Sequence, residues 1–159
     1  MPEPLDRIDF AILAALQQDA RLSNKELAAR VNLAQSSCLA RVRRLRKSGV
    51  LGSYHAEVEL RALGIGLQAM VAVQLRQHSR DLVEAFRAHA RTLPEVLSVY
   101  HVAGETDFLV HVAVRDADHL RDLAMDAFTT RPEVSRIRTS LIYERIRRWP
   151  LPIYVSEAD

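Results

Sequence analysis

Apolar positions near the start of the chain recur at the three- and four-residue spacing of amphipathic helices. Ile8, Ile12 and Leu16 predict one helix, and Asp6 precedes it as a suitable N-cap. Ser-Asn-Lys-Glu at residues 23–26 is a capping box, in which the serine hydroxyl and the glutamate carboxylate each accept from the other residue's backbone amide. These signals predict two short helices, the second beginning at residue 23.

A third helix is predicted from Gln35 to Ser48, with Gly49 as its C-terminal stop. Its apolar stripe includes Cys38, which favours a small core residue over a redox-active thiol. Asn32 tolerates the left-handed backbone that a sharp turn requires. Three short helices with a tight turn before the last predict a helix-turn-helix.

This helix-turn-helix segment is strongly basic. Between residues 20 and 52, eight lysines and arginines stand against one acid, so eight minus one gives a net charge of +7, whereas the whole chain carries +2. Such a segment is typical of a protein that binds a polyanion. A solvated basic face on a helical bundle is the alternative, but the capping box and the turn favour the DNA-binding motif. Double-stranded DNA is therefore the expected partner.

The third helix begins with small polar side chains, which can approach base edges in the major groove. Helical spacing places Ser37, Arg41 and Arg44 on one face, which we expect to point outward. Arginines farther along the helix can reach phosphates or guanine. The residues expected to contact DNA are Lys25, Gln35, Ser36, Ser37, Arg41, Arg43 and Arg44.

The second half of the chain contains an internal duplication. Leu-Pro-Glu-Val at residues 93–96 recurs as Arg-Pro-Glu-Val at residues 131–134, 38 residues later. A helical segment precedes each copy, and strand-like runs lie before the helix and after the repeat. The strands are predicted at residues 70–75, 97–103, 108–114 and 135–146. The order β-α-β, occurring twice, predicts a ferredoxin-like βαββαβ domain with an antiparallel sheet and both helices on one face.

The predicted strands are apolar on both faces. In the third strand, Phe108 and Val110 alternate with Leu109 and Ala113. A sheet covered on one face only should alternate more cleanly between apolar and polar residues. We therefore expect a second copy of the chain to cover the other face, in a homodimer that presents two recognition helices to a two-fold DNA site.

The expected fold is α+β, with an N-terminal helix-turn-helix domain joined by a strand linker to a ferredoxin-like domain. Alternation in residues 50–60 predicts the strand of the linker. The expected boundaries are 1–52 for the DNA-binding domain, 53–66 for the linker, 67–148 for the ferredoxin-like domain and 149–159 for a C-terminal tail. The one cysteine allows no intrachain disulfide. Because neither a secretory signal nor an apolar run of ~20 residues is present, we expect a cytoplasmic protein without a membrane partner.

Three stretches together resemble the leucine-responsive/asparagine-activated (Lrp/AsnC) transcription regulators of bacteria and archaea. They are LDRIDFAILAALQQDARLSNKELAARV from residue 5, RVRRLRKSGVLGSY from residue 41 and VAGETDF from residue 102. The resemblance implies a DNA-binding regulator that responds to an amino acid and forms homodimers, which assemble into octamers or other higher oligomers. Ala34 and Ala40 depart from the family pattern, which usually has serine and a polar residue there. Ala34 cannot cap the third helix with its side chain.

The resemblance also implies an effector pocket at the loop Gly104–Asp107. An amino acid carries a carboxylate, which backbone amides at the Gly104 turn could bind, and an ammonium, which Glu105 or Asp107 could pair with. Without the resemblance, the same residues suit an ordinary hairpin turn. The residues expected to bind the effector are Tyr100, His101, Gly104, Glu105, Thr106, Asp107, Thr139 and Ser140.

Two other classes of function fit the sequence less well. No Ser/His/Asp, Cys/His, P-loop or HExxH constellation is evident, so neither enzyme activity nor a cofactor is expected. His101 and His111 lie in the second and third predicted strands, where they could face each other across the hairpin and bind zinc or copper. No third ligand is clear. A metal-responsive regulator is therefore the alternative interpretation, and no metal site is expected.

Overall fold

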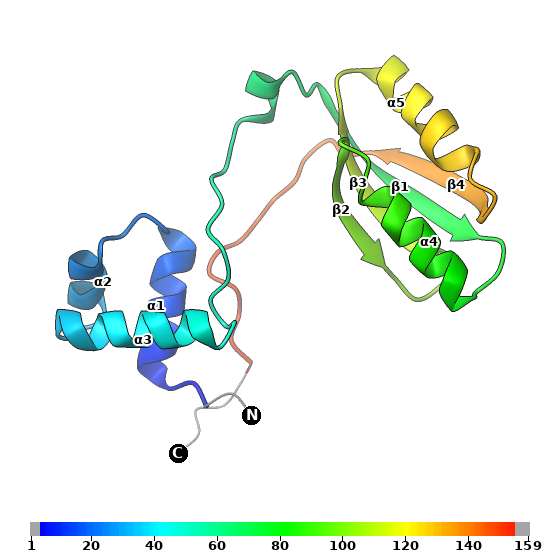
Figure 1. Cartoon of the computed structure of the whole chain (residues 1–159). Helices are drawn as coiled ribbons and strands as arrows, with labels where there is room; N and C mark the ends of the chain where they lie inside the picture. Colours follow the sequence, from blue (N-terminus) through cyan, green and yellow to red (C-terminus); the bar gives the residue numbers. More distant parts are fainter. Residues whose placement is uncertain (1–3, 155–159) are drawn as a thin grey trace. The chain divides into compact units, whose positions relative to one another are not determined.

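The computed structural model describes residues 4–154, which form two compact units (Figure 1). The first unit contains the residues up to 56 together with those from 146 on, and the second spans Glu57–Arg145. None of the helices between residues 4 and 154 has the length and hydrophobicity of a membrane span.

The first unit contains the predicted helices α1 (Arg7–Gln18), α2 (Asn24–Arg30) and α3 (Gln35–Lys47). Both predicted N-caps are present. The Asp6 carboxylate accepts from the amide of the residue three positions on, and Ser23 forms the expected capping box. Local side-chain chemistry thus sets where α1 and α2 begin.

The turn between α2 and α3 has the predicted backbone. Asn32 lies in the left-handed region with φ 53°, and Gly49 does so with φ 77° after α3. Ala34 occupies the N-cap of α3 without a side-chain hydrogen bond, as its methyl group requires. Helix α3 ends at Lys47, one residue before the predicted end.

The core of the first unit joins the apolar stripes of the three helices. Ile12, Cys38 and Leu45 are fully buried, and Leu16 and Leu27 are nearly so. Burial raises the pKa of the Cys38 thiol, which disfavours the reactive thiolate. Cys38 is therefore a structural core residue, as predicted.

A buried carboxylate ties α3 to α1. Asp9 is 0% exposed, and its oxygens accept from Arg41 Nη1 at 3.0 Å and from Arg44 Nη2 at 2.5 Å. We call these three residues the Asp9 clamp. Arg41 Nη1 also contacts Asp6 Oδ2 at 2.6 Å. The Asp9 amide chiefly, and Arg41 in addition, lower the pKa of the Asp6 carboxyl.

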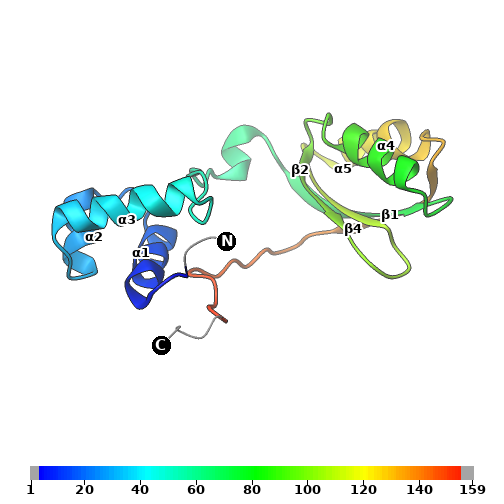
Figure 2. The ribbon, with the colours of Figure 1, turned by 60° about the horizontal axis from the view of Figure 1, so that its bottom comes forward.

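The second unit is the predicted ferredoxin-like domain. Its elements are the 3₁₀ helix η1 (Leu60–Leu63), β1 (Leu67–Leu75), α4 (Arg80–Ala90), β2 (Val96–His101), β3 (Phe108–Val114), α5 (Ala117–Leu123), the π-helical η2 (Ala124–Thr129) and β4 (Val134–Leu141). The strand order is β2-β3-β1-β4, and every neighbouring pair is antiparallel. Both α4 and α5 lie on one face of this sheet (Figure 2).

Two strand predictions are wrong. Residues 52–59 form no strand, and β4 ends at Leu141 instead of residue 146. A strand exists only where a neighbouring strand takes up its backbone hydrogen bonds. No strand of the described chain pairs with residues 52–59, and beyond Leu141 the last backbone bond to β1 is the one from the Ile142 amide to the Gln68 carbonyl. The alternating pattern therefore predicted an extended backbone, but it does not show whether a neighbouring strand is present to pair with it.

Helices of residues 57–145 pack against one face of the sheet and not against the other. Val71, Val110 and Phe86 are fully buried between the sheet and its helices. The opposite face, here called the open face, carries no α-helix of residues 57–145 (Figure 2). Its half-buried Met70 and Leu109 come from the two central strands β1 and β3.

We expect Asp9→Ala to lower the free energy of unfolding of the first unit by about 1–3 kcal/mol, because it removes the buried carboxylate that accepts hydrogen bonds from both arginines. Asp118→Ala is the matched control, since Asp118 is 81% exposed and pairs with Arg121 at the surface. That substitution should cost less than about 1 kcal/mol. Urea unfolding followed by far-UV circular dichroism measures both. Equal losses would show that the Asp9 clamp is worth no more than a surface ion pair.

Candidate nucleic-acid interface and ligand pocket

The outward face of α3 differs from the face predicted. The exposed residues at helical spacing along this helix are Ser36, Leu39, Ala40, Arg43 and Lys47. They lie on the side of α3 away from the buried Cys38 and Leu45. This set is here called the outward face of α3.

Arg41 and Arg44 do not lie on that outward face. Their guanidinium groups turn toward α1 and bind Asp9, with the two side chains 28% and 33% exposed. The expectation that both point outward is wrong, because the buried carboxylate of α1 attracts them more strongly than solvent does. Arg43, by contrast, is exposed at the centre of the outward face.

The other residues expected to contact DNA remain accessible. Lys25 is exposed on α2, and Gln35, Ser36 and Ser37 are exposed in the first turn of α3. The Gln35 carbonyl accepts from Asn24 Nδ2 at 2.9 Å, a bond that fixes the start of α3 against α2. At the other end of α3, the Arg46 guanidinium stacks 4.9 Å from the ring of Tyr54.

The predicted Gly104–Asp107 loop connects β2 to β3. Gly104 has φ 126°, a value that L-residues with a side chain rarely adopt. Asp107 is 4% exposed, and its carboxylate accepts from the Leu75 amide at 2.7 Å and lies 2.8 Å from His78 Nδ1. This carboxylate already has partners within the chain, so Asp107 fastens the loop to the end of β1.

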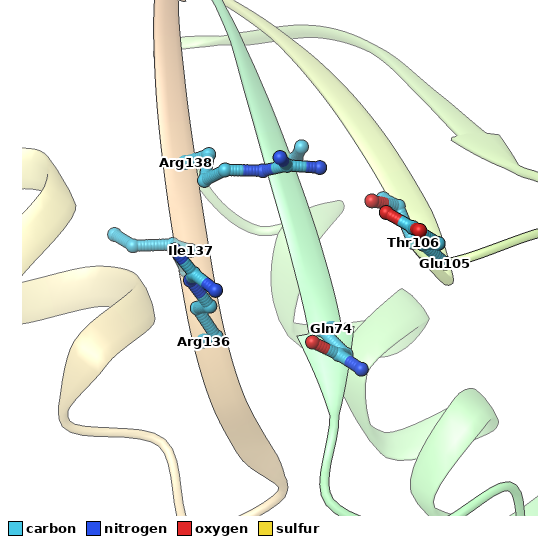
Figure 3. Close-up of a pocket in the computed structure, with 7 residues that line it drawn as sticks. Gln74, Glu105, Thr106, Arg136, Ile137 and Arg138 are labelled. Atoms are coloured by element: carbon cyan, nitrogen blue, oxygen red, sulfur yellow. The ribbon is translucent and has the colours of Figure 1, made fainter.

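A pocket of about 300 Å³ lies beside this loop. Its lining residues are Ala72, Gln74, Glu105, Thr106, Arg136, Ile137 and Arg138. Strand register brings them together, because Ala72 of β1 pairs with Arg138 of β4, and Gln74 with Arg136. Figure 3 shows the Arg138 side chain reaching across β1 toward Glu105 and Thr106. The pocket thus holds two guanidinium groups on one side and a carboxylate on the other.

The remaining predicted effector residues lie outside the pocket lining. Tyr100 is 50% exposed at the edge strand, and the His101 ring stacks on Phe108 at 4.8 Å. Thr139 pairs with Val71 and so shares the helix-covered face, whereas Ser140 pairs with Met70 on the open face. Sequence reasoning missed Gln74, Arg136 and Arg138. The two arginines at alternate positions of a predicted strand were the available signal.

The register of the β2–β3 hairpin separates the two histidines considered as metal ligands. His101 pairs with Phe108 on the helix-covered face, while His111 pairs with Ser98 on the open face. His111 Nε2 lies 3.0 Å from Gln68 Oε1. The expectation that they could face each other is therefore wrong. In the described part of the chain, no three His, Cys, Asp or Glu side chains are placed to hold a metal.

We expect Asp107→Ala to lower the free energy of unfolding of the second unit by about 1–3 kcal/mol, because the buried Leu75 amide loses its acceptor. His78→Ala is the control, since this side chain is 78% exposed and its contact with Asp107 should be worth less than about 1 kcal/mol. Urea unfolding measures both, and hydrogen exchange at the Leu75 amide gives a local readout. Faster exchange in Asp107→Ala alone is the expected result. Unchanged exchange in that variant would contradict the assigned bond.

Comparison with known proteins agrees with both units. A family model described as the Lrp/AsnC ligand binding domain matches residues 68–150, and one for winged helix-turn-helix DNA-binding matches residues 5–51.

The HTH-type transcriptional regulator AldR of Mycolicibacterium smegmatis is 43% identical over 90% of this chain and 84% of its own length. The leucine-responsive regulatory protein of Rhizobium meliloti is 36% identical over 90% and 92%, respectively. The crystal structure of a transcriptional regulator in complex with L-methionine, from Neisseria meningitidis, has a TM-score of 0.88 at 33% identity, covering 95% of this chain and 98% of that one. The chain belongs to the Lrp/AsnC family of transcriptional regulators.

Proposed function

We propose that this regulator binds a free amino acid in the pocket beside the Gly104–Asp107 loop and that the amino acid alters its binding to DNA. The observation that carries the proposal is the charge arrangement of the pocket, with Arg136 and Arg138 across from Glu105. A zwitterion has the complementary arrangement, because its carboxylate and ammonium lie close together on one carbon atom.

The two charged ends of the ligand take different partners. Guanidinium groups form paired hydrogen bonds with carboxylates, so we assign the carboxylate to Arg136 and Arg138. We assign the ammonium to Glu105, with Thr106 as a neutral acceptor beside it. Asp107 is left to its structural partners, Leu75 and His78.

The pocket also limits the ligand's size. A volume of about 300 Å³ suits a small molecule, and Ala72 leaves room along the sheet. The related regulator from Neisseria meningitidis was crystallised with L-methionine, which is consistent with an amino acid as the class of ligand. A ligand bound here changes DNA affinity only if the two DNA-binding states bind it with different affinity.

A thermal-shift screen of the amino acids identifies the ligand, and isothermal titration calorimetry then tests the site. We expect Arg138→Gln and Glu105→Gln each to weaken binding about tenfold or more, because each removes a charge-assisted hydrogen bond. Arg80→Gln, an exposed position at the start of α4, should leave the affinity unchanged.

Ligand analogues sharpen the same test. The amine that lacks the carboxylate should bind weakly and should be insensitive to Arg138→Gln, whereas the N-acetylated amino acid should be insensitive to Glu105→Gln. If both protein variants bind the amino acid as tightly as the parent, the amino acid does not bind in this pocket.

For DNA, the proposed partner is a duplex with two-fold symmetry, bound in the cytoplasm. Lys25, Gln35, Ser36, Ser37 and Arg43 stay candidates for contact, supported by their exposure. We assign Arg41 and Arg44 to holding α3 in place through the Asp9 clamp.

We also propose that two copies of the chain associate through their open faces. Met70 and Leu109 supply apolar surface on the central strands, and Tyr100 adds a half-exposed ring at the edge. Burial of such surface against a second copy would remove it from water and bring two recognition helices into one particle. Higher assemblies such as octamers would build on this dimer.

Leu109→Glu should shift the protein toward monomer, because the interface would then desolvate a carboxylate without a partner. Met125→Glu is the control, since Met125 is 56% exposed in η2 and lies away from the open face. Sedimentation velocity of the full chain measures both, with circular dichroism to verify folding. A dimer that persists in folded Leu109→Glu would contradict the proposed interface.

A further inference from the structure

We propose that the outward face of α3 reads a thymine followed or preceded by a guanine, with Leu39 and Ala40 against the thymine methyl and Arg43 on the guanine. This inference rests on DNA binding through α3. It names the specificity-determining residues and the chemical feature of the bases that each would recognise.

The apolar part of this face is conspicuous on a polar helix. Leu39 is 37% exposed, and its neighbour Ala40 is also exposed. The core positions of α3 are already filled by Cys38 and Leu45, so Leu39 is not needed to complete the packing of the unit. A single exposed leucine has no special meaning on a protein surface. Here, however, two apolar side chains adjoin on the face that would enter the groove.

The Asp9 clamp limits which arginines of α3 are available to contact a base. Arg41 and Arg44 bind a carboxylate that is 0% exposed, so moving either one to DNA would deprive the buried Asp9 of a charged partner. Arg43 is exposed one turn from Leu39 and is aligned with Ser36 at the start of the helix. Arg43 is therefore the arginine of the outward face of α3, and it can contact a base without breaking the Asp9 clamp.

The chemistry of the major groove matches this set. Thymine is the base that presents a methyl group there, and apolar side chains contact it. Guanine presents two acceptors, N7 and O6, which fit the paired donors of an arginine. Ser36 is small enough to let the start of α3 approach the bases, and Lys47, in the last turn, suits a phosphate.

The test begins with selection of binding sites by the full-length protein from a pool of random duplexes. Each thymine of the selected site is then replaced singly by deoxyuridine, which removes only the 5-methyl group, and affinity is measured by fluorescence anisotropy. We expect a loss of about fourfold at one position of each half-site, the size expected for one buried methyl group.

Protein variants assign the effect to its side chain. In Leu39→Asn, this deoxyuridine substitution should cost clearly less affinity, because the methyl group has lost the larger of its two apolar partners. Leu63→Asn, at a leucine that is 61% exposed in η1, is the control and should keep the parent's sensitivity. Arg43→Ala should relax the selected preference for guanine beside the thymine.

Once a binding site has been selected, three results would overturn the proposal. They are equal affinity for all the deoxyuridine duplexes, unchanged deoxyuridine sensitivity in Leu39→Asn, and an unchanged guanine preference in Arg43→Ala. Failure to enrich any sequence would also overturn it, and that result alone would count against sequence-specific DNA binding by this protein as well.

Discussion

The buried carboxylate of Asp9 is the constraint that decides what α3 can present to a partner. A charge that is 0% exposed is tolerated only if donors surround it, and the charged donors to Asp9 come from Arg41 and Arg44 of α3. This requirement fixes the rotation of α3 about its axis as well as its position against α1. The outward face is then whatever lies opposite, namely Ser36, Leu39, Ala40, Arg43 and Lys47. A basic helix is in this way divided into charges that hold the unit together and charges that remain for a ligand.

Net charge along the sequence did not reveal this division. The segment from residue 20 to residue 52 carries +7, yet the acids that pair with two of its arginines lie before it, in and next to α1. Asp9 and its partners are separated by 32 and 35 residues, so no local rule connects them. The helical wheel of α3 alone placed Arg41 and Arg44 together correctly. It could not tell whether that face met solvent or α1, because the answer depends on a side chain of another helix.

Features set by local chemistry were predictable from sequence. The caps at Asp6 and Ser23 and the left-handed backbone at Asn32 each depend on residues within one turn. The duplication around Pro-Glu-Val gave the order of strands and helices in the second unit, which followed the expected βαββαβ arrangement. The absence of a strand at residues 52–59 was not predictable in this way. A strand needs a neighbouring strand to pair with, and the sequence pattern of a segment does not identify that neighbour.

The pocket illustrates how register, once known, turns a sequence pattern into a site. Arg136 and Arg138 alternate along β4, and their pairing with Gln74 and Ala72 places both on the open face beside the Gly104–Asp107 loop. The same geometric rule separates His101 from His111, because their partners in β3 and β2 put them on opposite faces. A shift of one residue in either pairing would move every side chain of a strand to the other face. The ligand chemistry of this domain therefore depends on strand pairing, which sequence spacing constrains and the folded sheet determines.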